Sequence, residues 1–113
     1  NSRQAGKCGG VDGDRDNAAY IDSLGWVLFR RGRLGEARKE LERAAALPDG
    51  RDDPVVWDHL GDVRFRQKDL SGAREAWRTA VKLYEEGRRR ASDPRFREIK
   101  QKLQLPELQA QQP

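Results

Sequence analysis

The sequence has 113 residues but no methionine, one cysteine and one histidine. A single cysteine excludes an internal disulfide, and one histidine leaves too few ligands at the spacing that a zinc site requires. No apolar run approaches the ~18 residues of a membrane-spanning helix, and no signal-peptide pattern opens the chain. We therefore expect a soluble chain of the cytoplasm or periplasm, without metal, cofactor or membrane insertion. The lack of methionine indicates a processed chain or an excised fragment.

The sequence offers no pattern for catalysis either. The one histidine, His59, has no Cys, Ser or second His placed by a motif to act with it. A polar residue of a groove or of a helix surface is the better interpretation of His59, so we expect a protein that is not an enzyme.

The composition is polar. Charged residues make up 37% of the chain and hydrophobic residues 35%. This balance suits a thin, open structure better than a thick globular core. The formal net charge is +4, and almost all of the excess lies late in the chain. We therefore expect one small domain with a large surface and a basic C-terminal part.

A stretch from Ala18 to Leu47 carries two apolar stripes of helical period, separated by the turn signal Arg31-Gly32-Arg33. This pattern predicts a hairpin of two helices. A second stretch, Pro54 to Leu83, aligns with the first without a gap at the 36-residue separation of Gly25 and Gly61. Identities include Asp22/Asp58, Leu24/Leu60, Val27/Val63, Phe29/Phe65, Arg30/Arg66, Leu34/Leu70, Ala37/Ala73 and Ala44/Ala80. The chain therefore contains an internal repeat.

At these positions the chain resembles the tetratricopeptide repeat (TPR) family. The family pattern is a large apolar residue, Leu-Gly three residues later, and then Ala, a bulky residue and Ala. The matching residues are Ile21, Leu24-Gly25, Ala37, Leu41 and Ala44 in repeat one, and Trp57, Leu60-Gly61, Ala73, Trp77 and Ala80 in repeat two. Repeat two has no counterpart of Pro48, and the 36-residue period exceeds the usual ~34. The chain looks like the C-terminal repeats of a longer bacterial TPR protein.

The resemblance implies an all-α fold, a short TPR-like right-handed array of two helix-turn-helix hairpins plus a C-terminal capping helix. The expected parts are a flexible arm or artificial remnant over 1–16, a TPR-like domain over 17–104 and a frayed tail over 105–113. Within the domain, repeat one spans 18–53, repeat two 54–91 and the capping helix 93–104. Asn17, Asp53-Pro54 and Asp93-Pro94 are typical helix starts.

Gly25 and Gly61 lie in the middle of predicted helices, where each costs roughly 0.8–1 kcal/mol relative to alanine. We expect close packing within each hairpin to offset this cost, with the small residues Ala37 and Ala73 opposite the glycines. The predicted repeat-packing set is Leu24, Gly25, Ala37, Leu60, Gly61 and Ala73. A large residue at Gly25 should therefore destabilise far more than helix propensity predicts, because it would overpack the contact.

In TPR arrays the first helix of each hairpin lines a concave face that binds peptides. The family's ligand-facing positions fall here on Asp22, Trp26, Phe29, Arg30, Asp58, His59, Asp62, Phe65 and Arg66. Phe29 and Phe65 serve equally well as packing residues between repeats. Asp22 and Asp58 stand where the family's carboxylate clamp needs Lys or Asn. We therefore expect a protein or peptide partner of mixed charge with an apolar anchor, its basic groups facing Asp22, Asp58 and Asp62.

Two other functions compete with peptide binding. Two hairpins are fewer than the three repeats that a stable array normally needs, so open hairpin ends predict self-association, for example as a homodimer. The basic residues Arg88, Arg89, Arg90, Arg95, Arg97, Lys100 and Lys102 form a patch that attracts anions. No aromatic residue interleaves the arginine run, so specific nucleic-acid binding is the weakest of these interpretations.

Overall fold

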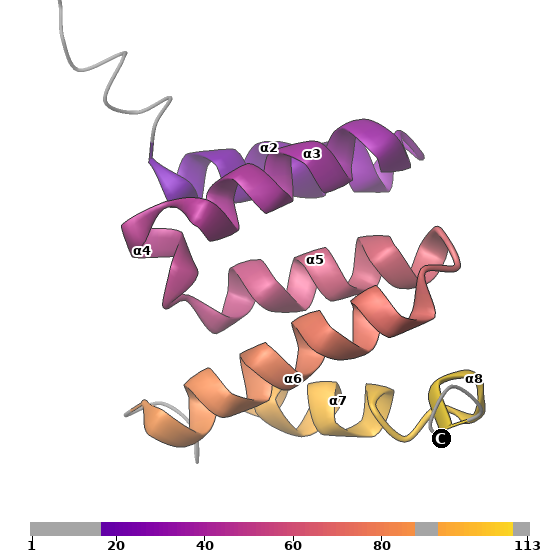
Figure 1. Ribbon diagram of the computed structural model, residues 1–113. Coiled ribbons are helices and arrows are strands. Elements are labelled where there is room, and N and C mark those ends of the chain that lie inside the picture. The colour runs from indigo at the N-terminus through magenta and orange to yellow at the C-terminus, as the bar shows by residue number, and fades with distance from the viewer. Residues whose placement is uncertain (1–16, 88–92, 110–113) are drawn as a thin grey trace, which may run out of the picture.

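The computed structural model describes residues 17–87 and 93–109, and every regular element within them is a helix. The helices stack in chain order, with the first hairpin at one end and the C-terminal helices at the other (Figure 1). The prediction of an all-α fold of repeated helical hairpins is confirmed. The arm over 1–16, the arginines Arg88, Arg89 and Arg90, and residues 110–113 of the tail lie outside the described residues.

The first hairpin consists of α2 (Ala18–Arg30) and α3 (Leu34–Ala46). Asn17 caps α2, because its side-chain oxygen accepts hydrogen bonds from two backbone N–H groups of the first turn. The chain reverses at Gly32, whose φ of 81° is open to glycine without steric cost. The hairpin therefore begins and turns at residues whose types favour those roles.

The second hairpin consists of α5 (Pro54–Arg66) and α6 (Leu70–Glu86). Asp53 caps α5 by accepting a hydrogen bond from a first-turn backbone N–H at 2.9 Å, and the proline that follows suits the first helical position. At the turn, Lys68 has a φ of 67°. This residue is equivalent to Gly32, so a left-handed residue reverses the chain in both hairpins.

A short helix, α4 (Pro48–Arg51), connects the hairpins, where the sequence predicted only the end of a helix. Gly50 is buried there, and a Cβ atom on it would lie 2.9 Å from the Cβ of Ala18 and closer still to the carbonyl oxygen of Ala44. The indole N–H of Trp57 donates a hydrogen bond of 2.9 Å to the carbonyl oxygen of the last residue of α4. The connection is therefore packed against the first hairpin and bonded to the second.

Two helices, α7 (Pro94–Lys102) and α8 (Pro106–Gln109), cover the C-terminal end of the stack (Figure 1). Ile99 of α7 and Leu108 of α8 are fully buried against α6. The carbonyl oxygen of Leu108 also accepts a hydrogen bond from Arg74 Nη1 at 3.1 Å. The tail predicted to fray from residue 105 is therefore held in place over α8, because an apolar side chain of the tail reaches the core.

The buried apolar residues form two clusters. The first lies between the first hairpin and α5 and includes Leu41 and Leu60. The second lies among α6, α7 and α8 and includes Trp77 and Tyr84. Trp57 is partly buried and packs against both clusters, so this indole lies where the two cores meet.

Close helix packing at the two mid-helix glycines is confirmed, but their neighbours differ from the prediction. A Cβ atom on Gly25 would lie 2.7 Å from Leu41 Cγ, and one on Gly61 would lie 2.8 Å from Trp77 Cε2. Two further indole atoms would lie closer still to the added carbon on Gly61. The nearest neighbour of each glycine is therefore the bulky residue of its repeat, Leu41 or Trp77, rather than the alanine predicted there.

The exposed apolar face of α2 corrects one predicted packing residue. Leu24 is 38% exposed, whereas its equivalent Leu60 is 1% exposed. Tyr20 and Val27 lie on the same face of α2, at 52% and 48% exposure. The corresponding face of α5 packs against α3, but no helix within residues 17–87 and 93–109 covers this face of α2. The prediction that Leu24 packs between repeats therefore does not hold within these residues. We call Tyr20, Leu24 and Val27 the α2 stripe.

Candidate partner-binding groove

Two carboxylates of α5 face two basic side chains of α7. Lys102 Nζ donates hydrogen bonds to Asp58 Oδ1 at 2.9 Å and to Asp62 Oδ1 at 2.8 Å. Arg95 Nη1 lies 3.5 Å from Asp58 Oδ2. Asp58 is only 3% exposed, so the charge that balances it comes from α7 of the same chain. We call these four residues the α5–α7 ion-pair cluster.

Burial shifts two pKa values in this cluster. Burial and the adjacent charge of Asp58 raise the pKa of Asp62, while Lys102 opposes that shift. Burial lowers the pKa of Lys102, but the charges and hydrogen bonds of Asp62 and Asp58 outweigh it, so the pKa of Lys102 lies above its usual value. Lys102 is therefore charged at neutral pH, and this charge allows two carboxylates to lie side by side.

A second set of contacts joins α2 to α5 through His59. His59 Nδ1 lies 2.8 Å from Asp22 Oδ1, and His59 Nε2 lies 3.4 Å from Arg95 Nη1. Because a guanidinium group only donates, Nε2 accepts from it in this arrangement and the proton on Nδ1 points to the carboxylate. The Trp26 ring stacks on the His59 ring at 4.1 Å and on the Phe29 ring at 4.7 Å between centroids. His59 therefore acts as a structural link between the two repeats.

Next to the ion-pair cluster lies an open cavity of about 230 Å³. Its lining comes from both hairpins and the C-terminal segment: Phe29, Asp62, Phe65, Arg66, Trp77, Lys102 and Leu105. The Phe65 ring packs on Trp77 at 5.6 Å between centroids, and the Arg66 guanidinium lies 5.3 Å from the centre of the Phe29 ring. The lining therefore combines three aromatic rings with three charged side chains, which suits an apolar side chain of a partner. We call it the aromatic cavity.

The structure brings together only part of the predicted groove. Phe29, Asp62, Phe65 and Arg66 line the aromatic cavity. Asp22, Trp26, Asp58 and His59 instead contact one another or α7, and Arg30 is exposed at the end of α2. The expectation that Asp58 faces a basic ligand group is wrong, because Lys102 and Arg95 already pair with it and cover it. Asp22 and Asp62 likewise have partners within the chain.

Three residues that line the aromatic cavity were absent from the predicted groove. Trp77 was identified only as the bulky residue of repeat two, Lys102 as part of a basic patch, and Leu105 as the start of the tail. A signal for Lys102 was present, since Arg95 and Lys102 are seven residues apart and share one face of a helix. Their pairing with Asp58 also removes them from the free basic surface that nucleic-acid binding would use.

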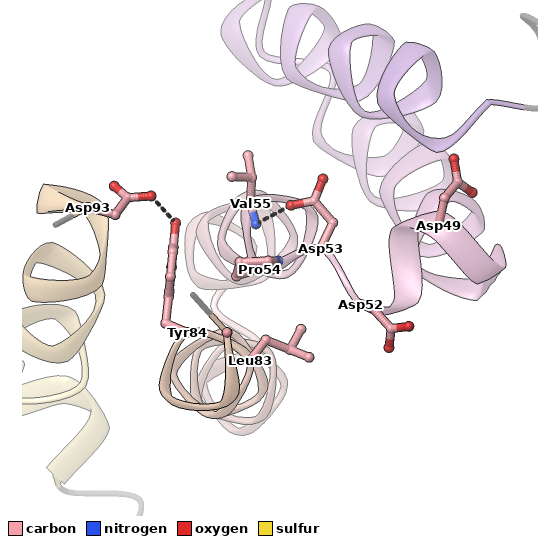
Figure 2. A pocket seen from close by; sticks show the side chains of 9 residues that line it. Asp49, Asp52, Asp53, Pro54, Val55, Leu83, Tyr84 and Asp93 are labelled. Carbon is pink, nitrogen blue, oxygen red and sulfur yellow. Dashed lines mark hydrogen bonds between the residues drawn. The ribbon is translucent and has the colours of Figure 1, made fainter. Parts of the chain in front are cut away.

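A larger cavity, of about 440 Å³, lies at the opposite end of α5 and is rich in aspartates (Figure 2). Figure 2 shows Asp53 bonded to the backbone of Val55 and Asp93 bonded to the Tyr84 hydroxyl. Asp93 also caps α7, and Asp49 accepts a hydrogen bond from a backbone N–H of α2. Most of these carboxylates therefore have a structural role at helix ends, and the aromatic cavity is the better candidate site.

Residues 17–87 and 93–109 contain neither a cluster of metal-ligand side chains nor a membrane-spanning helix. Within residues 17–87 and 93–109 there is no group of three or more His, Cys, Asp or Glu side chains that could hold a metal ion. In the same part of the chain, no helix has both the length and the apolar character needed to cross a membrane.

The sequence is similar to a TPR repeat-containing protein of Pseudomonas aeruginosa, with 37% identity over 70 residues. The matched stretch is 61% of this chain but 12% of that relative. No protein-family model matches the chain, and no solved structure matches it. In its sequence and in its all-α fold of stacked helical hairpins, the chain resembles part of a longer TPR repeat-containing protein.

Proposed function

We propose that this chain is a non-catalytic interaction module that binds a peptide or helix of a partner protein through the aromatic cavity. The observation that carries the proposal is the set of three aromatic rings, Phe29, Phe65 and Trp77, that meet from both hairpins at an open cavity. Burying an apolar side chain of a partner there is favourable by roughly 25 cal/mol per Å² of apolar surface. Arg66, an exposed residue of the lining, supplies donors that fix the orientation of the bound segment.

Selection from a random-peptide phage library tests this proposal. We expect enrichment of peptides with an aromatic or large aliphatic residue, and about tenfold weaker binding of these peptides to Phe29→Ser, equivalent to ~1.4 kcal/mol. Val27→Ser is the control, because Val27 lies on the same helix but outside the cavity. Circular dichroism checks that both variants fold. Failure to enrich any peptide, or equal loss of binding in both variants, would contradict the proposal.

A second candidate function is self-association through the α2 stripe. The residues equivalent to it in α5, Val56, Leu60 and Val63, are almost completely buried against the first hairpin. The same face of α2 is therefore suited to packing against a helix, and a second copy of the chain supplies one. Three side chains make a small contact, well below the ~1,600 Å² of a typical stable interface, so this association is weak.

Sedimentation equilibrium over a wide concentration range tests the self-association. We expect the average mass to rise toward twice that of the monomer at high concentration and to fall on dilution. Leu24→Glu should keep the chain monomeric throughout, because a charge in an apolar contact is costly, whereas Lys39→Glu on the exposed side of α3 should leave the mass unchanged. A wild-type chain that stays monomeric at the highest concentration would exclude this function.

A further inference from the structure

We infer that the ligand of the aromatic cavity is acidic: an apolar anchor residue with a flanking Asp or Glu that binds Arg66. This inference rests on the proposed peptide-binding function and adds the charge of the ligand. It reverses the preference expected from the sequence, in which basic ligand groups face the aspartates of α2 and α5.

The two aspartates of the α5–α7 ion-pair cluster have no unbalanced charge to offer a basic ligand. Asp58 pairs with Lys102 and Arg95, and Asp62 pairs with Lys102. Two negative charges therefore face two positive charges. Asp22 does not line the cavity, and its carboxylate accepts the Nδ1 proton of His59 at 2.8 Å. A ligand lysine would have to displace one of these partners, and the displaced cation would then lose a partly buried contact. Basic groups therefore gain little at this site.

Arg66 is in the opposite situation. It is exposed and has no carboxylate within 4.0 Å among residues 17–87 and 93–109. Its guanidinium carbon lies 5.3 Å from the centre of the Phe29 ring, within the range of a cation–π contact. This contact uses none of the N–H groups, which can bind a carboxylate through two hydrogen bonds. The ring also limits the side-chain entropy that Arg66 would lose on binding. Arg66 is therefore partly pre-oriented for an acidic group.

The position of Arg66 links charge preference to the apolar anchor. Arg66 and the three aromatic residues line the same cavity, so an anchor side chain in the cavity places its neighbouring residues near the guanidinium. A bound anchor also displaces water, which strengthens the attraction between a carboxylate and Arg66 and the repulsion between a lysine and Arg66.

Fluorescence anisotropy with three labelled peptides tests the inference. Each peptide carries a central Leu-Phe pair, flanked on both sides by two Glu, two Ser or two Lys residues. We expect the Glu peptide to bind about tenfold more tightly than the Lys peptide, with the Ser peptide between them. Arg66→Glu should reverse this order. Arg78→Glu, an equal charge change on the exposed side of α6 away from the cavity, should keep it.

The outcomes separate this inference from the proposed function. If all three peptides bind equally well, or if the Lys peptide binds best, the cavity binds peptides but the acidic preference is wrong. If Arg66→Glu and Arg78→Glu change the order equally, the preference reflects only net charge and the role of Arg66 is wrong. If no peptide binds the wild type and library selection also fails, the proposed function itself falls.

Discussion

Replacing Gly61 with alanine is expected to lower the free energy of unfolding by about 2 kcal/mol, because it overpacks the core. Helix propensity alone predicts the opposite sign, a gain of roughly 1 kcal/mol. The added methyl group would meet three atoms of the Trp77 indole. That indole is 1% exposed, and its N–H donates a hydrogen bond to the carbonyl oxygen of Asp58, so it has little room to move away.

Two other glycines are matched controls for Gly61→Ala. A methyl group on Gly25 would meet the aliphatic side chain of Leu41, which adjusts more easily than an indole, so we expect a loss of about 1 kcal/mol. A methyl group on Gly35 would meet nothing within 4 Å, so its substitution should leave stability unchanged or slightly raised. Urea unfolding followed by circular dichroism measures all three. A gain in stability for Gly61→Ala would contradict the close contact with Trp77.

Replacing Lys102 with methionine is expected to cost about 3 kcal/mol of folding free energy at neutral pH. The substitution keeps the apolar stem of the side chain but removes the charge between Asp58 and Asp62. Asp58 is only 3% exposed, so water cannot replace the lost partner, and two carboxylates then repel each other. Lys39→Met, on the exposed surface of α3, is the control and should change stability by less than about 0.5 kcal/mol.

The pH dependence of Lys102→Met identifies the repulsion as the cause. Burial and the charge of Asp58 already raise the pKa of Asp62 above its ordinary value of 3.8, and loss of Lys102 raises it further. As the pH falls toward this further raised pKa, Asp62 takes up a proton in the folded variant before it does so in folded wild type or in the unfolded chain. The folded variant therefore binds more protons than folded wild type, and its stability relative to wild type improves as the pH falls. We therefore expect a smaller difference in unfolding free energy at pH 4.5 than at pH 7.

A second substitution tests the same cause at constant pH. Asp62→Asn added to Lys102→Met removes one of the two opposed charges, so the double variant should be more stable at neutral pH than Lys102→Met alone. A difference between wild type and Lys102→Met that is independent of pH, together with no recovery in the double variant, would indicate lost packing rather than unpaired carboxylates.

The hairpins could be predicted because their signals are local and occur twice. Helical period, the turn at Gly32 and the caps Asn17 and Asp53 each act within a few residues of the chain. The duplicated glycines predicted a close approach, yet not the residue in contact, because Leu41 and Trp77 reach the glycines from the neighbouring helix. The spacing of residues along a helix predicts which face each residue lies on, but not which side chain of the neighbouring helix packs against it.

The candidate site was harder to predict because its charges pair over long distances in the sequence. Asp58 and Lys102 are separated by 44 residues, and the family pattern places Asp58 on a ligand-facing position without indicating that α7 covers it. Phe29 and Phe65 both line the cavity, whereas Trp26 stacks on His59, and the choice between core and groove depended on α7 and α8. Phe65 illustrates this, because it packs against Trp77 and also lines the cavity.

Trp57 has a consequence for how this chain unfolds. It packs against both apolar clusters, and its indole N–H bonds to the end of α4. In a stack where each helical pair contacts mainly its neighbours, the ends can open separately unless a shared residue makes their opening interdependent. When one apolar cluster opens, Trp57 loses contacts that also stabilise the other cluster, so the two ends tend to unfold together. The cooperativity of unfolding therefore depends on Trp57 more strongly than its buried surface area alone would suggest.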